Sequence, residues 1–226
     1  MSDTTTGDAE RTLAEIVTER PSAARILESF GLDYCCGGAA RLDAACADSG
    51  VPTDRVLAAL AEVHLDVEPE WATMSPAEMV DHLESVHHAY LHTELPRLDA
   101  LAEKVAGVHG GRHPELLDVL ADVKDLRDDL EPHLMKEERV LFPAIRNHVP
   151  GNRLAAPISV MLAEHDTTGA LLARLQRSAL DFAVPDDACA SYRALYEGLD
   201  ELTRDTHLHV HKENNVLFPA VLASST

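Results

Sequence analysis

Aromatic residues are scarce in this 226-residue chain, because Phe, Trp and Tyr together make up only 4% of it. Positive charge is scarce as well: 19 Lys and Arg stand against 39 Asp and Glu, which gives a formal net charge of −20 at pH 7. A surface this acidic repels phosphate backbones and anionic lipids. The composition therefore excludes nucleic acid and membrane surfaces as expected partners.

Long apolar runs are missing too. No segment reaches the roughly 20 apolar residues that a membrane-spanning helix needs. The first ten residues, MSDTTTGDAE, have neither the basic start nor the apolar stretch of a signal peptide. The chain has only four cysteines, too few for a disulfide scaffold. We therefore expect a soluble, cytoplasmic protein whose thiols are free.

Helical periodicity recurs along the chain, whereas no stretch shows convincing strand alternation. We expect an all-α fold in three parts: a small helical domain over 1–66, a linker over 67–75 and an up-down four-helix bundle over 76–226. Gly31 and Gly50 are expected to end two of the short N-terminal helices. The four long helices are expected near 76–106, 113–148, 155–181 and 186–222.

One motif occurs twice. HLMKEERVLFPAI begins at position 133 and HVHKENNVLFPAV begins at 209, so H-x3-E-x3-LFPA recurs after 209 − 133 = 76 positions. Residues i and i+4 of a helix share a face, so each copy can point an imidazole and a carboxylate inward. The repeat predicts a pseudo-symmetric bundle whose interior receives four such side chains, namely His133, Glu137, His209 and Glu213. The prolines at 143 and 219 are expected to kink or end the last turns.

The other two long helices should then contribute matching donors. The third offers one histidine, His165, whereas the first offers His82, His87, His88 and His92. The helical period places His87 nearer the centre of the apolar stripe and His88 at its edge. The register of the repeat favours His88 instead, because aligning it with His165 superposes apolar residues (Leu83 on Val160, Leu95 on Leu172, Leu98 on Leu175). We follow the register.

Four imidazoles and two carboxylates thus converge from four helices. Six donors are too many for a four-coordinate zinc site, and they are richer in nitrogen than the carboxylate sites of ferritin-like bundles. Two metals bridged by Glu137 and Glu213 fit better. Imidazole and carboxylate suit iron, although zinc competes on affinity. The remaining histidines are expected at the surface or behind the ligands: His82, His92, His109, His113, His148, His207 and His211.

These residues resemble those of the hemerythrin-like di-iron bundles over about the last 150 positions. With DYCCGG at 33–38, HLMKEERVLFP, SVMLAEHD and KENNVLFP, nearly the whole chain resembles the repair-of-iron-centres family. The resemblance implies an oxo- or hydroxo-bridged centre of two iron ions. The implied metal ligands are His88, His133, Glu137, His165, His209 and Glu213. The family often has Tyr where this chain has His87.

The resemblance also implies a function: repair of iron-sulfur clusters damaged by nitrosative or oxidative stress, through iron delivery or removal and nitric oxide reductase activity. The implied partners are damaged iron-sulfur proteins, with nitric oxide or oxygen as small ligands. The alternative is a hemerythrin-like carrier or sensor of oxygen or iron. Oxygen carriers use a fifth histidine, which has no counterpart in register here. Whether the chain forms a homodimer stays open.

Three further residues are candidates for direct roles. Cys35 and Cys36 precede a helix expected to begin near Ala39, where a helix N-terminus would lower the thiol pKa. Gly37 and Gly38 would let the backbone turn tightly and let a partner approach. We expect a redox or iron-handling role for this pair, with packing beside a turn as the alternative. Glu164 is either a carboxylate lining access to the metals or an exposed helix residue. The isolated Cys46 and Cys189 are expected to pack in the interior.

Overall fold

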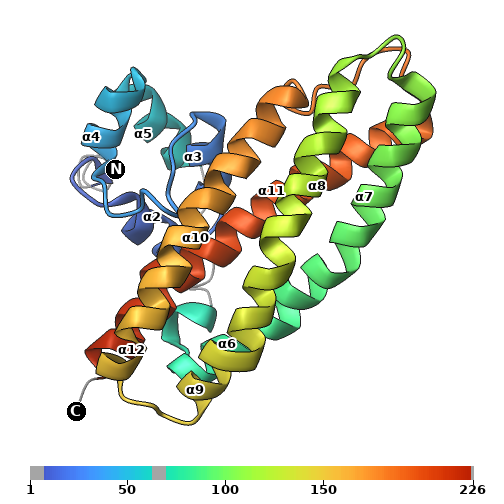
Figure 1. Cartoon of the computed structure of the whole chain (residues 1–226). Helices are drawn as coiled ribbons and strands as arrows, with labels where there is room; N and C mark the ends of the chain where they lie inside the picture. The colour runs from blue at the N-terminus through green and yellow to red at the C-terminus, as the bar shows by residue number, and fades with distance from the viewer. Residues whose placement is uncertain (1–7, 63–69, 225–226) are drawn as a thin grey trace. The chain divides into compact units, whose positions relative to one another are not determined.

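The computed structural model describes residues 8–62 and 70–224, and within these ranges it is helical with no strand (Figure 1). The prediction of an all-α fold is confirmed. Backbone contacts divide the chain into two compact units, one of residues 1–79, 150–152 and 208–226 and the other of residues 80–149 and 153–207. The predicted linker over 67–75 lies partly outside the described residues. None of the helices described has the length and apolar character needed to cross a membrane.

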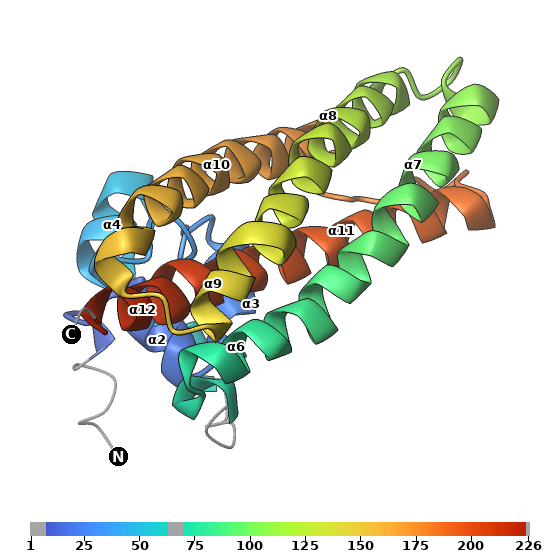
Figure 2. The same cartoon turned by 60° about the horizontal axis from the view of Figure 1, so that its bottom comes forward.

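Four long helices build the bundle: α7 (Ala89–His109), α8 (Glu115–Lys136), α10 (Gly151–Ser178) and α11 (Ala190–Lys212). They run lengthwise beside one another (Figure 2). Apolar residues recur every three or four positions, so each helix presents one stripe to a shared core. On α7 this stripe includes Leu91, Leu95 and Leu98, all 2% exposed or less. Burying each such side chain contributes about 1.5–3 kcal/mol.

Three π-helical turns interrupt the α-helical path: η2 (Glu84–His88) after α6 (Pro76–Leu83), η3 (Glu137–Leu141) before α9 (Phe142–Arg146), and η4 (Glu213–Leu217) before α12 (Phe218–Ala223). Pro143 and Pro219 are the second residues of α9 and α12. A proline has no N–H for the carbonyl four residues earlier, and the wider turn just before it accommodates that loss. The expected disturbance at the prolines therefore takes the form of a π-turn, and the helix continues beyond it.

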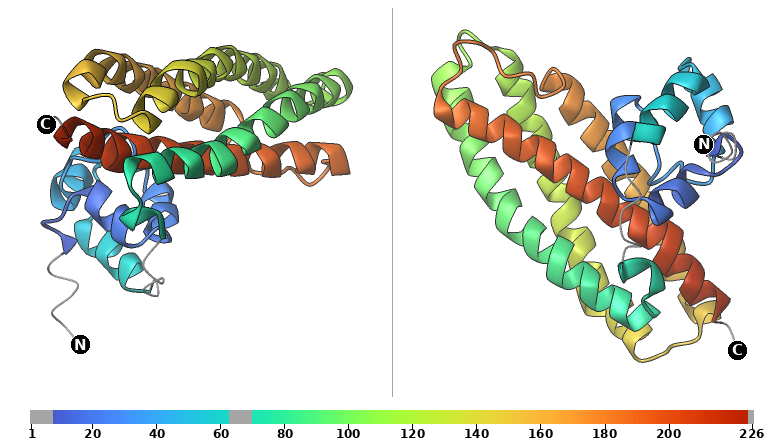
Figure 3. Two further views of the ribbon diagram at one scale, coloured as in Figure 1. Left: turned by 90° about the horizontal axis from the view of Figure 1, so that it is seen from below. Right: turned by 180° about the vertical axis from the view of Figure 1, so that it is seen from behind.

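Within residues 8–62 the N-terminal part contains the short helices α2 (Leu13–Glu19), α3 (Ala23–Ser29), α4 (Leu42–Ser49) and α5 (Thr53–Glu62). A short 3-10 helix, η1 (Glu70–Thr73), follows them. Thr12 caps α2 through a capping box with Glu15, and Gly50 ends α4 in the left-handed conformation at φ 68°. Figure 3 shows these helices, in blue and cyan, gathered into a small cluster. Their core includes Leu13, Ile16, Leu27 and Leu42, together with Val210 from α11.

The two isolated cysteines, Cys46 and Cys189, differ in burial. Cys46 is fully buried in the N-terminal core, as expected for a packing residue. Cys189 is exposed, so the expectation that it packs in the interior is wrong. It lies immediately before α11.

Gly38 is expected to be intolerant of any side chain. A Cβ added there would lie 2.5 Å from the carbonyl oxygen of Tyr34 and 2.9 Å from Oδ1 of Asn215. Gly38→Ala should therefore lower the free energy of unfolding by about 1–3 kcal/mol, as overpacking does elsewhere. Gly107→Ala is the matched control, because Gly107 lies inside α7 and a Cβ added to it would meet nothing within 4 Å. That change should raise stability by about 0.5–1 kcal/mol. Urea unfolding followed by circular dichroism measures both, and equal effects of the two changes would contradict the packing argument.

Candidate metal centre

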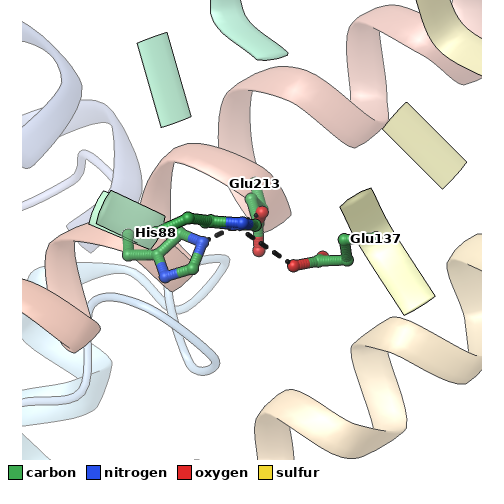
Figure 4. Close-up of side chains that lie close together, drawn as sticks. His88, Glu137 and Glu213 are labelled. Atoms are coloured by element: carbon green, nitrogen blue, oxygen red, sulfur yellow. Dashed lines mark hydrogen bonds and ion pairs between the residues drawn. The ribbon is translucent and has the colours of Figure 1, made fainter. Parts of the chain in front are cut away.

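The six residues implied as ligands converge in the structure. They form two groups of four in which the donor atoms all lie within 4.8 Å of one another: His88, Glu137, His209 and Glu213 in one, and His133, Glu137, His165 and Glu213 in the other. Glu137 and Glu213 belong to both groups. Figure 4 shows His88, Glu137 and Glu213 with their polar ends turned toward one another.

The helices fix the distances between these donors. Nε2 of His133 lies 3.4 Å from Oε2 of Glu137, and Nε2 of His209 lies 3.1 Å from Oε1 of Glu213. Each of these pairs has the i, i+4 spacing that the repeat predicts. In both copies the π-turn begins at the glutamate. Two Nε2 atoms, from His165 and His133, face each other at 3.1 Å. This crowding of lone-pair donors is typical of a metal site.

The burial of the two glutamates also indicates a metal site, because their negative charges need compensation. Both glutamates are 0% exposed, and the four histidines are 2% exposed or less. Two carboxylates removed from water cost several kcal/mol each unless a cation compensates them. The donors of the two groups are imidazoles and carboxylates. The donor chemistry therefore fits metal cations, and the sharing of both carboxylates fits a pair of them.

Carboxylates outside the cluster orient two of the imidazoles. Nδ1 of His133 lies 2.8 Å from Oε2 of Glu164, which also forms an ion pair with Lys136. Nδ1 of His88 lies 3.0 Å from Oε1 of Glu138. In each pair the imidazole N–H on Nδ1 donates to the carboxylate, which directs the Nε2 lone pair toward the centre. Glu164 therefore has a defined contact with a candidate ligand.

Sequence reasoning missed Glu138 and its contact with a candidate ligand. Oε1 of Glu138 also accepts a hydrogen bond from Nε2 of the exposed His92, at 2.7 Å. Partial burial favours a higher pKa for Glu138, but its hydrogen bonds to His92 and His88 outweigh burial and lower that pKa. The adjacent pair Glu137–Glu138 was the available signal, because neighbours on a helix point about 100° apart and can face different partners.

Of the two adjacent histidines, His87 lies outside the two histidine-containing donor groups. It is buried, but its Nδ1 is 2.8 Å from Oδ1 of Asp205, and neither of the two histidine-containing groups includes it. Its neighbour His88 is a member of the first group. The geometry supports the register of the repeat rather than the centre of the apolar stripe.

Asp33, Cys35 and Cys36 form a third group of potential metal donors. Oδ1 of Asp33 accepts hydrogen bonds from the backbone N–H groups of Cys35 and Cys36, both at 3.0 Å, and from the Cys35 thiol at 3.1 Å. The carbonyl of Cys35 accepts hydrogen bonds from the side-chain amides of Asn214, at 3.3 Å, and Asn215, at 3.0 Å. Both asparagines follow Glu213 directly, so the π-turn that carries Glu213 also holds the cysteine turn.

The thiol chemistry of this turn differs from the expectation. The helix after it, α4, begins at Leu42 with Arg41 as its N-cap, so the cysteine pair is not at a helix N-terminus. The pKa of Cys35 is raised well above its usual value, first by its hydrogen bond with Cys36 and then by burial and the nearby charge of Asp33. For Cys35 the expected lowering of the pKa is therefore wrong. Cys35 is a thiol at neutral pH unless a bound cation displaces its proton.

His211 also differs from the expectation for the remaining histidines. It is fully buried, with Nε2 3.1 Å from Oγ1 of Thr18 and Nδ1 3.3 Å from the carbonyl oxygen of Tyr34. Burial lowers its pKa to about 4, so the ring is neutral and joins the cysteine turn to the end of α11 by hydrogen bonds.

Comparison with known proteins gives two family matches. Residues 79–221 match the hemerythrin HHE cation binding domain, and residues 9–64 match ScdA_N, a domain of unknown function. A probable iron-sulfur cluster repair protein of Haemophilus influenzae is 36% identical over 220 residues, covering 95% of this chain and 97% of its own length. The iron-sulfur cluster repair protein YtfE of Escherichia coli O157:H7 is 34% identical, again covering 95% and 97%. The protein of that name from Dickeya chrysanthemi is 36% identical, covering 94% and 97%.

Removing both shared carboxylates should abolish metal binding. Glu137→Ala with Glu213→Ala takes away the only anionic donors of both groups. The loss of affinity should exceed the roughly 10–100-fold effect of removing an outer hydrogen-bond partner. Metal per chain is measured by elemental analysis after gel filtration. Glu131→Ala, an exposed position on α8, is the control and should keep the wild-type metal content. A double variant that retains this content would refute the assignment.

The two adjacent histidines should behave differently. His88→Ala removes a donor from the first group and should reduce the metal content, whereas His87→Ala should leave it near the wild-type value because His87 contacts Asp205. Elemental analysis and the visible absorption spectrum provide the readouts. Loss of metal from the His87 variant alone would show that the register of the repeat is displaced by one residue.

Proposed function

Because this chain belongs to the iron-sulfur cluster repair family of hemerythrin-like proteins, we propose that it repairs damaged iron-sulfur clusters by handling iron at a two-iron centre. The proposed ligands are the six buried side chains of the two overlapping groups. One observation carries the proposal: both Glu137 and Glu213 lie within reach of all four imidazoles, through two groups that share them. Two shared carboxylates are what a pair of cations requires.

The number of protein ligands affects how readily such a centre would bind small molecules and release iron. If two iron ions bind here, the four imidazoles with one bond each and the two shared carboxylates with two bonds each would supply about eight bonds, or four for each iron. Such a pair of irons would supply redox chemistry and exchangeable positions for small ligands such as nitric oxide. The modest number of protein ligands also favours release of ferrous iron to an acceptor.

The surrounding residues supply orientation and charge. Glu138 and Glu164 hold the protons on Nδ1 of His88 and His133, which keeps each Nε2 available to a metal. Lys136 pairs with Glu164 and offsets its charge near the centre. These groups keep the site arranged before a metal arrives, which lowers the reorganisation that binding requires.

The oxygen-carrier alternative lacks support from the donor set. A carrier needs a fifth histidine to saturate one iron, and in the described ranges each of the two histidine-containing groups holds two histidines. A carrier also has no use for the turn of Asp33, Cys35 and Cys36. We assign this turn a role in passing iron, because a carboxylate and two thiolates are suitable ligands for ferrous iron. Its anchoring by Asn214 and Asn215 ties it to the segment that bears Glu213.

A cluster-repair assay tests the proposal. The iron-loaded protein is mixed with a dehydratase whose iron-sulfur cluster has been damaged by nitric oxide or peroxide, and recovery of dehydratase activity is followed. The wild-type protein should restore activity faster than an equal amount of free ferrous iron. Recovery no faster than with free iron would contradict the proposed function.

Replacing both thiols of the cysteine turn should separate iron storage from iron transfer. Cys35→Ser with Cys36→Ser should leave the iron content unchanged, because neither residue belongs to the two histidine-containing groups. The rate of cluster repair should fall by about tenfold or more, since hydroxyls are poor replacements for thiolate ligands. Cys189→Ser is the matched control and should repair normally. A double variant that repairs at the wild-type rate would assign the pair to packing.

A further inference from the structure

A thiol paired with an imidazole lies at the end of α7 that is far from His88. His109 is the last residue of α7, and 109 − 88 = 21 residues of helix correspond to about 30 Å. Cys189 lies immediately before α11, and its carbonyl accepts a hydrogen bond from the backbone N–H of Arg193 at 3.1 Å, which makes it the N-cap. Figures 1 and 3 show the α7–α8 and α10–α11 connections at the same end of the bundle.

The two side chains are paired. Nε2 of His109 lies 3.2 Å from Sγ of Cys189. The imidazole is 94% buried (6% exposed), whereas Cys189 is exposed. Nδ1 of His109 is buried and has no hydrogen-bond partner among the residues described, so the sulfur is the hydrogen-bonding partner of this ring. The buried imidazole of His109 therefore uses Nε2 to contact the thiol of an exposed cysteine.

Both helix ends favour separation of charge in this pair. A thiolate at Cys189 would sit at the N-terminus of the 23-residue helix α11, where partial positive charge stabilises anions. An imidazolium at His109 would sit at the C-terminus of α7, where partial negative charge stabilises cations. The proton therefore has a favourable path from the sulfur to Nε2.

The neighbouring charges are largely engaged with one another. His113 has Nδ1 3.0 Å from Glu115 and Nε2 3.1 Å from Asp187, and its hydrogen bond with Asp187 is the main cause of its raised pKa. Arg112 lies 3.9 Å from Asp187. Tyr192 packs its ring 5.7 Å from that of His109, and its hydroxyl donates to Glu115 at 3.4 Å. The carboxylates near the pair are thus bound by other groups.

We propose that Cys189 is a reactive thiol, activated by His109, that exchanges with low-molecular-weight disulfides. Nε2 of His109 accepts the thiol proton, and the thiolate attacks one sulfur of the disulfide. A bond forms between that sulfur and Cys189 as the disulfide bond breaks, and the departing thiolate takes the proton from His109. The exchange leaves a mixed disulfide on Cys189 and one free small thiol, so it needs no further oxidant.

A metal site at this position is less well supported. In the part of the chain that the structure describes, the metal-compatible groups of three or more donors include neither His109 nor Cys189. Two donors alone hold a divalent cation weakly. A thiol with a proton acceptor, open to solvent on one side, matches the requirements of an exchange nucleophile instead.

The test uses an aromatic disulfide, dithiobis-nitrobenzoate, on the full-length, iron-loaded protein between pH 5.5 and pH 8.5. One thiol per chain should react fast, and peptide mass spectrometry should place the adduct on Cys189. The rate of an ordinary thiol, with a pKa near 8.5, falls about tenfold for each pH unit below that value. The rate at Cys189 should fall less steeply than this, because Nε2 of His109, 3.2 Å away, accepts the thiol proton as the sulfur attacks.

Two variants complete the test. Cys189→Ser should remove the fast phase and leave the iron content unchanged. His109→Gln keeps a polar side chain but no proton acceptor of suitable basicity, so the rate at pH 6 should fall about tenfold or more. Glutathione disulfide should likewise leave a mixed disulfide on Cys189 that dithiothreitol removes.

Three results would overturn the proposal: an adduct mainly on Cys36, a rate at Cys189 that declines with pH as for a small free thiol, or an unchanged rate in His109→Gln. Circular dichroism reports whether His109→Gln folds. If it does not, the pH profile of wild-type Cys189 decides the matter alone.

Discussion

Two carboxylates buried among four imidazoles are the constraint on which the rest of the bundle depends. Glu137 and Glu213 are removed from water by the same helices that bring the histidines together. Leaving two such charges uncompensated in a protein interior is costly, so a positive charge is required at that place. The outer carboxylates, the π-turns and the repeat itself are then ways of holding six donors at fixed positions around it.

The internal repeat explains why so much of the site could be predicted from the sequence. A helix converts the spacing i, i+4 into a shared face, so His133 with Glu137 needed no structure to be paired. A second copy at a fixed offset doubled the signal and provided the register for His88. The all-α fold followed from the same periodicity, since four amphipathic helices with short connections have few ways to bury their apolar stripes.

The features that could not be predicted depend on distances between residues remote in sequence. Glu138 contacts His88, 50 positions away, and Cys189 contacts His109, 80 positions away. The pKa of Cys35 was misjudged because α4 begins three residues later than expected, at Leu42 rather than Ala39, which removes the helix end from the thiols. An error of three residues in the start of a helix thus reversed the conclusion about the pKa of this thiol.

The two copies of the repeat differ in the residues that directly follow the shared glutamate. Counting 76 positions forward from Glu138 and Arg139 leads to Asn214 and Asn215. In the first copy, the residue after the shared glutamate orients a histidine, whereas in the second copy the same place donates to the carbonyl of Cys35. A carboxylate at this place accepts a hydrogen bond, whereas an amide donates one, so the two copies use the same position for different contacts. The pseudo-symmetry of the repeat therefore holds for the histidine and glutamate of each copy and ends at the residue beside them.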